Sequence, residues 1–82
     1  MQPQEKYKYF AKNYNAILKR YVGKYNTEGN HVKLYRELKN YFSIIGLSHI
    51  IFTIEKTNNG LMVYYPDQDQ RTFIKNLITP QP

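Results

Sequence analysis

Apolar residues recur at every third or fourth position in the first half of the chain, and this spacing predicts two helices. The first helix is expected over residues 6–22. The second is expected over residues 31–45, with Asn30 as its N-cap and Gly46 as the glycine that ends it. Because a short Gly-containing segment links them, the two helices should lie antiparallel. Five tyrosines fall on the expected buried faces: Tyr7, Tyr14, Tyr21, Tyr35 and Tyr41.

The apolar pattern then changes to a period of two, which predicts a β-hairpin over residues 49–56 and 61–65. Asn59-Gly60 lies between the two runs and is a strong hairpin signal. A two-residue turn at Asn59-Gly60 pairs Ile54 with Tyr65 and brings the larger apolar sets onto one face.

A smaller apolar set lies on the other face of the hairpin: Ile51, Met62 and Tyr64. A lone two-stranded sheet is marginal and leaves both edges open, so this second face is a candidate interface. We expect the C-terminal helix to cover one face of the hairpin within the monomer. A homodimer built on the hairpin is the alternative.

A third helix is expected after Pro66, with Asp67 as its N-cap and Gln70 three residues later in a capping-box pattern. The predicted fold class is α+β, in the order ααββα: an antiparallel helix pair, a two-stranded β-hairpin and a short C-terminal helix. The 82 residues should form a single small domain over 1–82, with flexible ends at 1–5 and 79–82.

The net positive charge of the chain is confined to residues 1–45, which carry nine Lys or Arg residues against three Glu residues. Residues 46–82 carry three basic and three acidic residues. An excess of positive charge in one part of a small chain favours a polyanionic partner, most simply nucleic acid. The predicted contacts are the basic residues of the helical half and one tyrosine outside the core stripe: Lys8, Lys12, Lys19, Arg20, Lys24, Lys33, Arg36 and Tyr9.

The sequence offers few residues and motifs that could support catalysis. The chain has no cysteine, which excludes a disulfide framework, a thiolate metal site and a cysteine nucleophile. His31 and His49 have no obvious carboxylate to orient them, and the sequence has neither a phosphate-binding glycine loop nor zinc-ligand spacing. We therefore expect no enzyme activity, no metal and no cofactor. No apolar run is long enough for a membrane span or a secretory signal, so the expected location is cytoplasmic.

The sequence therefore predicts a non-enzymatic protein that binds DNA or RNA. Its small size and its Lys- and Asn-rich composition, typical of AT-rich genomes, favour a small regulator or accessory factor of a virus or mobile element. The competing class is a protein–protein interaction module, such as a viral inhibitor of a host or defence protein, whose basic face meets an acidic surface. The sequence leaves both classes open, together with a monomer or a homodimer.

Overall fold

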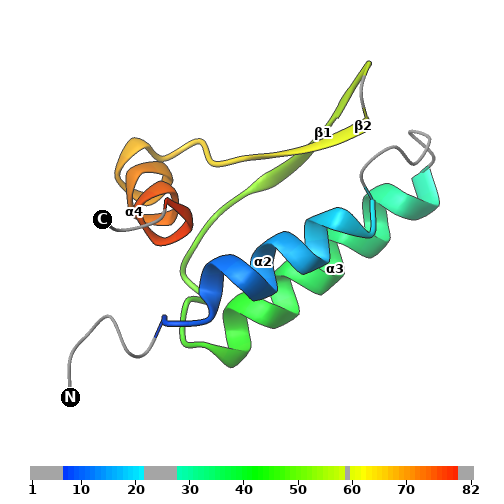
Figure 1. Ribbon diagram of the computed structural model, residues 1–82. Coiled ribbons are helices and arrows are strands. Elements are labelled where there is room, and N and C mark those ends of the chain that lie inside the picture. The colour runs from blue at the N-terminus through cyan, green and yellow to red at the C-terminus, as the bar shows by residue number, and fades with distance from the viewer. Residues whose placement is uncertain (1–6, 22–27, 59, 80–82) are drawn as a thin grey trace.

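Three helices and one hairpin make up the fold, in a computed structural model that describes residues 7–21, 28–58 and 60–79. The elements follow in the order α2 (Phe10–Lys19), α3 (Glu28–Ile44), β1 (Thr53–Thr57), β2 (Gly60–Tyr64) and α4 (Gln68–Ile78). The first two helices lie side by side and antiparallel, the hairpin crosses over them, and the last helix packs at one end (Figure 1). The predicted α+β order of helix, helix, hairpin and helix is confirmed.

Helix α2 is shorter than the periodicity predicts. Tyr7 begins a turn that leads into the helix, and its carbonyl accepts a hydrogen bond from the Phe10 amide at 3.0 Å. At the other end the amides of Arg20 and Tyr21 bond three residues back, at 3.2 and 2.9 Å, so the last turn tightens. Tyr21 stays buried beyond the helix, and the apolar stripe therefore runs past both helix ends.

Helix α3 begins at Glu28, so the prediction that Asn30 caps it was wrong: Asn30 lies in the first turn. The C-terminal prediction is confirmed. Gly46 has a φ of 80°, in the left-handed region that favours glycine. Its amide bonds to the Ser43 carbonyl at 3.2 Å and the Leu47 amide bonds to the Phe42 carbonyl at 2.7 Å, which is the pairing of a Schellman motif.

The hairpin register differs by two residues from the expected one. Ile54 pairs with Val63 and Thr57 pairs with Gly60, so Gly60 belongs to β2 and not to the turn as expected. The Thr57 hydroxyl donates to the Gly60 carbonyl at 3.0 Å across this turn. Because side chains alternate with a period of two, a two-residue shift leaves every side chain on its expected face, and the apolar pattern alone fits both registers.

Helix α4 begins as predicted, because the Asp67 carboxylate accepts a hydrogen bond from the Gln70 amide at 3.0 Å. The Gln70 side chain forms other hydrogen bonds than the reciprocal one of a capping box. Its carbonyl oxygen accepts from the Ile51 amide at 2.8 Å and its amide group donates to the His49 carbonyl at 3.3 Å. Gln70 thereby fixes α4 to the segment that enters β1. Thr79 is the C-cap of α4, whereas residues 1–5 and 80–82 of the expected flexible ends lie outside the described residues.

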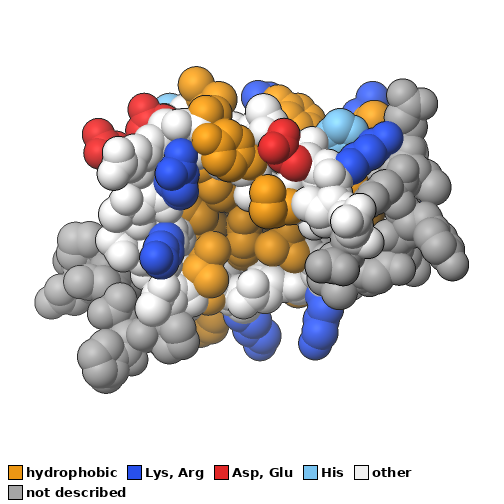
Figure 2. Space-filling view, turned by 90° about the horizontal axis from the view of Figure 1, so that it is seen from above, with side chains coloured by type: hydrophobic (Ala, Val, Ile, Leu, Met, Phe, Trp, Pro, Cys, Tyr) orange, Lys and Arg blue, Asp and Glu red, His pale blue; other side chains and the backbone are white. Residues whose placement is uncertain are grey.

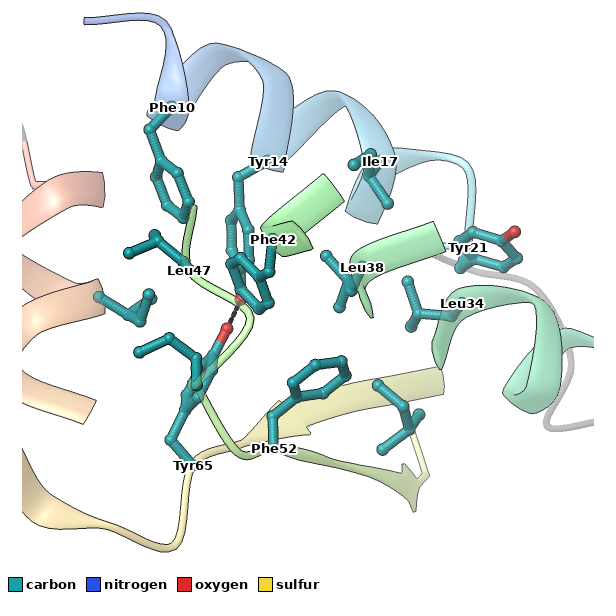
Figure 3. Close-up of a cluster of buried hydrophobic side chains, with 13 residues drawn as sticks. Phe10, Tyr14, Ile17, Tyr21, Leu34, Leu38, Phe42, Leu47, Phe52 and Tyr65 are labelled. Carbon is teal, nitrogen blue, oxygen red and sulfur yellow. Dashed lines mark hydrogen bonds between the residues drawn. The ribbon is translucent and has the colours of Figure 1, made fainter. Parts of the chain in front are cut away.

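Apolar side chains gather between α4 and the hairpin in the view from above (Figure 2), and the buried ones meet in one cluster (Figure 3). Phe42 lies at its centre, with its ring centroid 5.5 Å from that of Phe52 and 6.1 Å from that of Phe10. Tyr35, expected to be buried, is 37% exposed and rests on Phe52 at 5.0 Å. The core is drawn from the three helices, from β1 and from the segments next to them: Phe10, Tyr14, Ile17, Tyr21, Leu34, Leu38, Phe42, Leu47, Ile50, Phe52, Ile54, Tyr65 and Ile74.

Candidate nucleic-acid interface

The basic residues of α2 lie on the side of the helix away from the core. Phe10, Tyr14 and Ile17 are buried, whereas Lys12 and Lys19 are exposed. At about 100° per residue, these two lysines lie opposite the buried stripe. Lys8 is exposed in the turn that precedes the helix. This arrangement leaves the ammonium groups free to approach a phosphate backbone without disturbing the core.

The basic residues Lys33 and Arg36 of α3 are also exposed. Glu37 is their nearest acidic neighbour along α3 and could in principle compensate their charge. In the structure the Glu37 carboxylate accepts from the Arg20 guanidinium of α2 at 3.0 Å. Among the described residues this is the one ion pair. Arg20 is therefore partly neutralised, while Lys33 and Arg36 keep their full charge.

The ion pair also shows where basic residues of the two helices come close to one another. Since Glu37 reaches Arg20 at the C-terminal end of α2, the stripe of α3 that holds Lys33 and Glu37 borders α2. Arg20 thus lies close to the middle of α3. Lys24, the remaining predicted contact, lies outside the described residues.

Tyr9 is the aromatic residue best placed to join such an interface. Its side chain is 60% exposed, and the Lys8 ammonium lies 5.5 Å from the centre of its ring. An exposed ring beside a cation can stack on an unpaired base while the cation meets a phosphate. The exposed position of Tyr9 is compatible with a nucleic-acid contact, and that contact stays a prediction.

The second face of the hairpin is largely exposed. Ile51 and Met62 are 62% and 48% exposed. Helix α4 contacts this face at Tyr64, where the Arg71 guanidinium lies 5.4 Å from the ring centre. Tyr64 is thus held by the fold, and Ile51 and Met62 form the free part of the predicted interface.

Two buried tyrosine hydroxyl groups form a hydrogen bond that the sequence pattern does not predict, because the two residues are 51 positions apart. The hydroxyls of Tyr14 and Tyr65 share a hydrogen bond of 2.7 Å inside the core (Figure 3). Burial raises the pKa of both hydroxyls above the ordinary value of 10.0. At Tyr65 the neighbouring Tyr14 raises the pKa further. Both groups stay neutral near pH 7 and link α2 to the end of β2.

Because the pKa values of these two hydroxyls are raised, we expect the folded protein to lose stability at alkaline pH. The unfolded chain releases their protons near pH 10, whereas the folded chain keeps them to higher pH. Above pH 10 the unfolded state therefore binds fewer protons, and the free energy of unfolding falls by up to about 1.4 kcal/mol per pH unit for each tyrosine. Urea denaturation at about pH 8 and about pH 11 measures this fall.

Replacing both partners by phenylalanine removes the effect without leaving an unpaired hydroxyl. The double variant Tyr14→Phe/Tyr65→Phe should lose much less stability between the two pH values than the wild type. Tyr9→Phe is the control, because that hydroxyl is exposed and its variant should follow the wild-type curve. Equal pH dependence of the wild type and the double variant would contradict the assignment.

No metal site is formed by the described residues: nowhere do three His, Asp or Glu side chains come together as a metal ion would need. His31 lies in the first turn of α3, and His49 is an exposed residue in the segment before β1. Within the described ranges, no helix has both the length and the apolar character needed to cross a membrane.

Comparisons with protein-family models, with curated proteins and with solved structures gave no match for this chain.

Proposed function

We propose that this chain is a non-enzymatic nucleic-acid-binding protein, a small regulator or accessory factor, that meets its partner with the outer sides of α2 and α3. One observation carries the proposal: the two helices, with the turn before α2, form one layer whose exposed residues include six basic side chains without an ion-pair partner in the described part of the chain. One of the six is Lys39, whose ammonium lies 5.8 Å from the centre of the Tyr35 ring. We call the other five the basic layer: Lys8, Lys12, Lys19, Lys33 and Arg36.

The basic layer has the dimensions of a phosphate contact. At 1.5 Å per residue, Lys8 and Lys19 are separated by roughly 16 Å along α2. A duplex presents several phosphates over that length, because it carries one charge per about 1.7 Å of its axis. The contacts proposed here are to the backbone, which gives affinity and position but no direct reading of base sequence.

Tyr9 adds a preference for unpaired strands. Its exposed ring, beside the Lys8 ammonium, can stack on a base that is not engaged in a duplex. Binding to single strands would use this ring together with the basic layer.

An acidic protein surface is the second candidate partner. The exposed side chains of Ile51 and Met62 favour it, because apolar side chains at a protein interface are buried on binding and those at a phosphate contact are not. On this alternative the basic layer would steer the approach to the partner.

Nuclease treatment separates the two candidates. The tagged chain should recover nucleic acid from a cell lysate, and proteins that reach it through nucleic acid should be lost when the lysate is treated with nuclease. Recovery of no nucleic acid, together with a protein retained in stoichiometric amount after nuclease treatment, would contradict the proposal and favour the acidic protein surface.

A further inference from the structure

A hollow of about 500 Å³ lies between α2, β2 and α4, apart from the basic layer. Figure 2 shows apolar side chains gathered in the middle of this face. The Tyr14, Tyr21 and Tyr65 rings contribute to its lining, and Leu34 of α3 adds to it. The other apolar lining residues come from α2, β2 and α4: Leu18, Leu61, Met62, Val63, Ile74 and Ile78. Its volume is in the range of ordinary ligand sites.

The hollow borders an open strand edge. The sheet has two strands, β1 packs against α3, and β2 is the edge on the side of the hollow. Residues on either side of a two-residue turn form a hydrogen-bonded pair, and such pairs alternate along an antiparallel ladder. Thr57 with Gly60 is that first pair, so the backbone groups of Leu61 and Val63 point away from β1.

The open edge is short, because Arg71 closes its far end. The Arg71 guanidinium donates to the Tyr65 carbonyl at 2.9 Å and to the Pro66 carbonyl at 3.4 Å. The available donors and acceptors are therefore those of Leu61 and Val63, enough for one short added strand.

The charge around the hollow is positive. Arg71 and Lys75 lie one turn apart on α4, and both line the hollow. No Asp or Glu is among its lining residues. The hydrogen bonds of Arg71 fix its guanidinium in place, and the Lys75 side chain is exposed. An occupant that carries a carboxylate next to α4 would complement these two cations.

We propose that this site binds an extended peptide segment of a partner protein, apolar at alternate positions and acidic at the end next to α4. The segment adds a strand beside β2 through the backbone groups of Leu61 and Val63. Its alternate side chains, about 6.6 Å apart, enter the hollow. A carboxylate then reaches Lys75 and Arg71.

A second copy of this chain fits the site less well. Its β2, residues 60–64, would have to form the added strand, and that sequence has no acidic residue to meet Arg71 and Lys75. A nucleic acid fits less well too, because the lining is mostly apolar. Charge complementarity therefore favours an acidic peptide.

The test uses two labelled synthetic peptides in which Val alternates with Thr, one ending in two Glu residues and the other in two Lys residues. Fluorescence anisotropy with the full chain should show that the Glu-tailed peptide binds at least about tenfold more tightly. Lys75→Glu should remove or reverse this preference. Lys33→Glu makes the same change of net charge on α3 and should leave the preference in place.

The position of the peptide is tested separately by amide NMR. Adding the Glu-tailed peptide should shift the amide signals of Leu61 and Val63 and slow their hydrogen exchange. The proposal is overturned if the two peptides bind equally, if Lys75→Glu and Lys33→Glu behave alike, or if the shifts fall on α2 and α3 instead. It is also overturned if the chain forms a dimer that occupies the β2 edge.

Discussion

Replacing Phe42 by alanine should unfold much of the protein. Phe42 is 1% exposed and lies at the centre of the aromatic cluster, within 6.1 Å of Phe10 and 5.5 Å of Phe52 between ring centroids. Emptying a buried aromatic site costs about 3–5 kcal/mol. The free energy of unfolding of a domain is only about 5–15 kcal/mol, and in a chain this small it is expected near the lower limit.

Thermal denaturation followed by circular dichroism measures this loss. The melting temperature of Phe42→Ala should fall by more than about 12 °C, since each kcal/mol corresponds to about 4–8 °C in a domain of this size. Phe52→Ala, also buried, should behave in the same way. Tyr9→Ala is the matched aromatic control at an exposed position and should change stability by no more than about 0.5 kcal/mol. Similar melting temperatures for Phe42→Ala and Tyr9→Ala would show that the core has been placed wrongly.

The second large effect concerns the basic layer. Replacing Lys8, Lys12 and Lys19 together by glutamine should lower the affinity for duplex DNA or RNA by about 10- to 100-fold near 0.1 M salt. The fold should be retained, because all three side chains lie away from the buried stripe of α2. The matched control is Lys39→Gln/Lys56→Gln/Lys75→Gln, which removes the same charge from exposed positions outside the layer.

Local features of the fold could be predicted from the sequence, because they depend on a few neighbouring residues. The Asp67 cap of α4 and the left-handed Gly46 at the end of α3 are examples, and both are observed. The order of elements followed from the periods of the apolar pattern. The predicted start of α3 was wrong, because an Asn residue can lie within the first turn of a helix as well as at its N-cap. The helix begins at Glu28, two residues before Asn30.

Features that join distant parts of the chain could not be predicted. The Tyr14–Tyr65 hydrogen bond and the contacts of Gln70 with residues 49 and 51 depend on how α4 packs against the rest. The ion pair between Glu37 and Arg20 also depends on how separate elements pack together. Two acceptable partners lie beside it on α3, but the arrangement of α2 brings Arg20 to 3.0 Å.

Part of the candidate site followed from the sequence and part did not. Exposure of the five basic residues follows from their helical positions opposite apolar ones, so the pattern was sufficient. The hollow beside β2 has no sequence signal, because its lining residues come from four elements and each apolar one looks like an ordinary core residue in its own element.

The salt dependence of nucleic-acid binding tests the central claim most directly. Affinity for a short duplex is measured by fluorescence anisotropy between about 50 and 200 mM salt, for the wild type and for both triple variants. If the basic layer contacts phosphates, wild-type affinity should fall steeply over this range. The slope of log affinity against log salt should then be smaller by about 2.7 in Lys8→Gln/Lys12→Gln/Lys19→Gln, and by much less in the control triple variant. Absence of wild-type binding at low salt, or equal slopes for the two triple variants, would contradict the account.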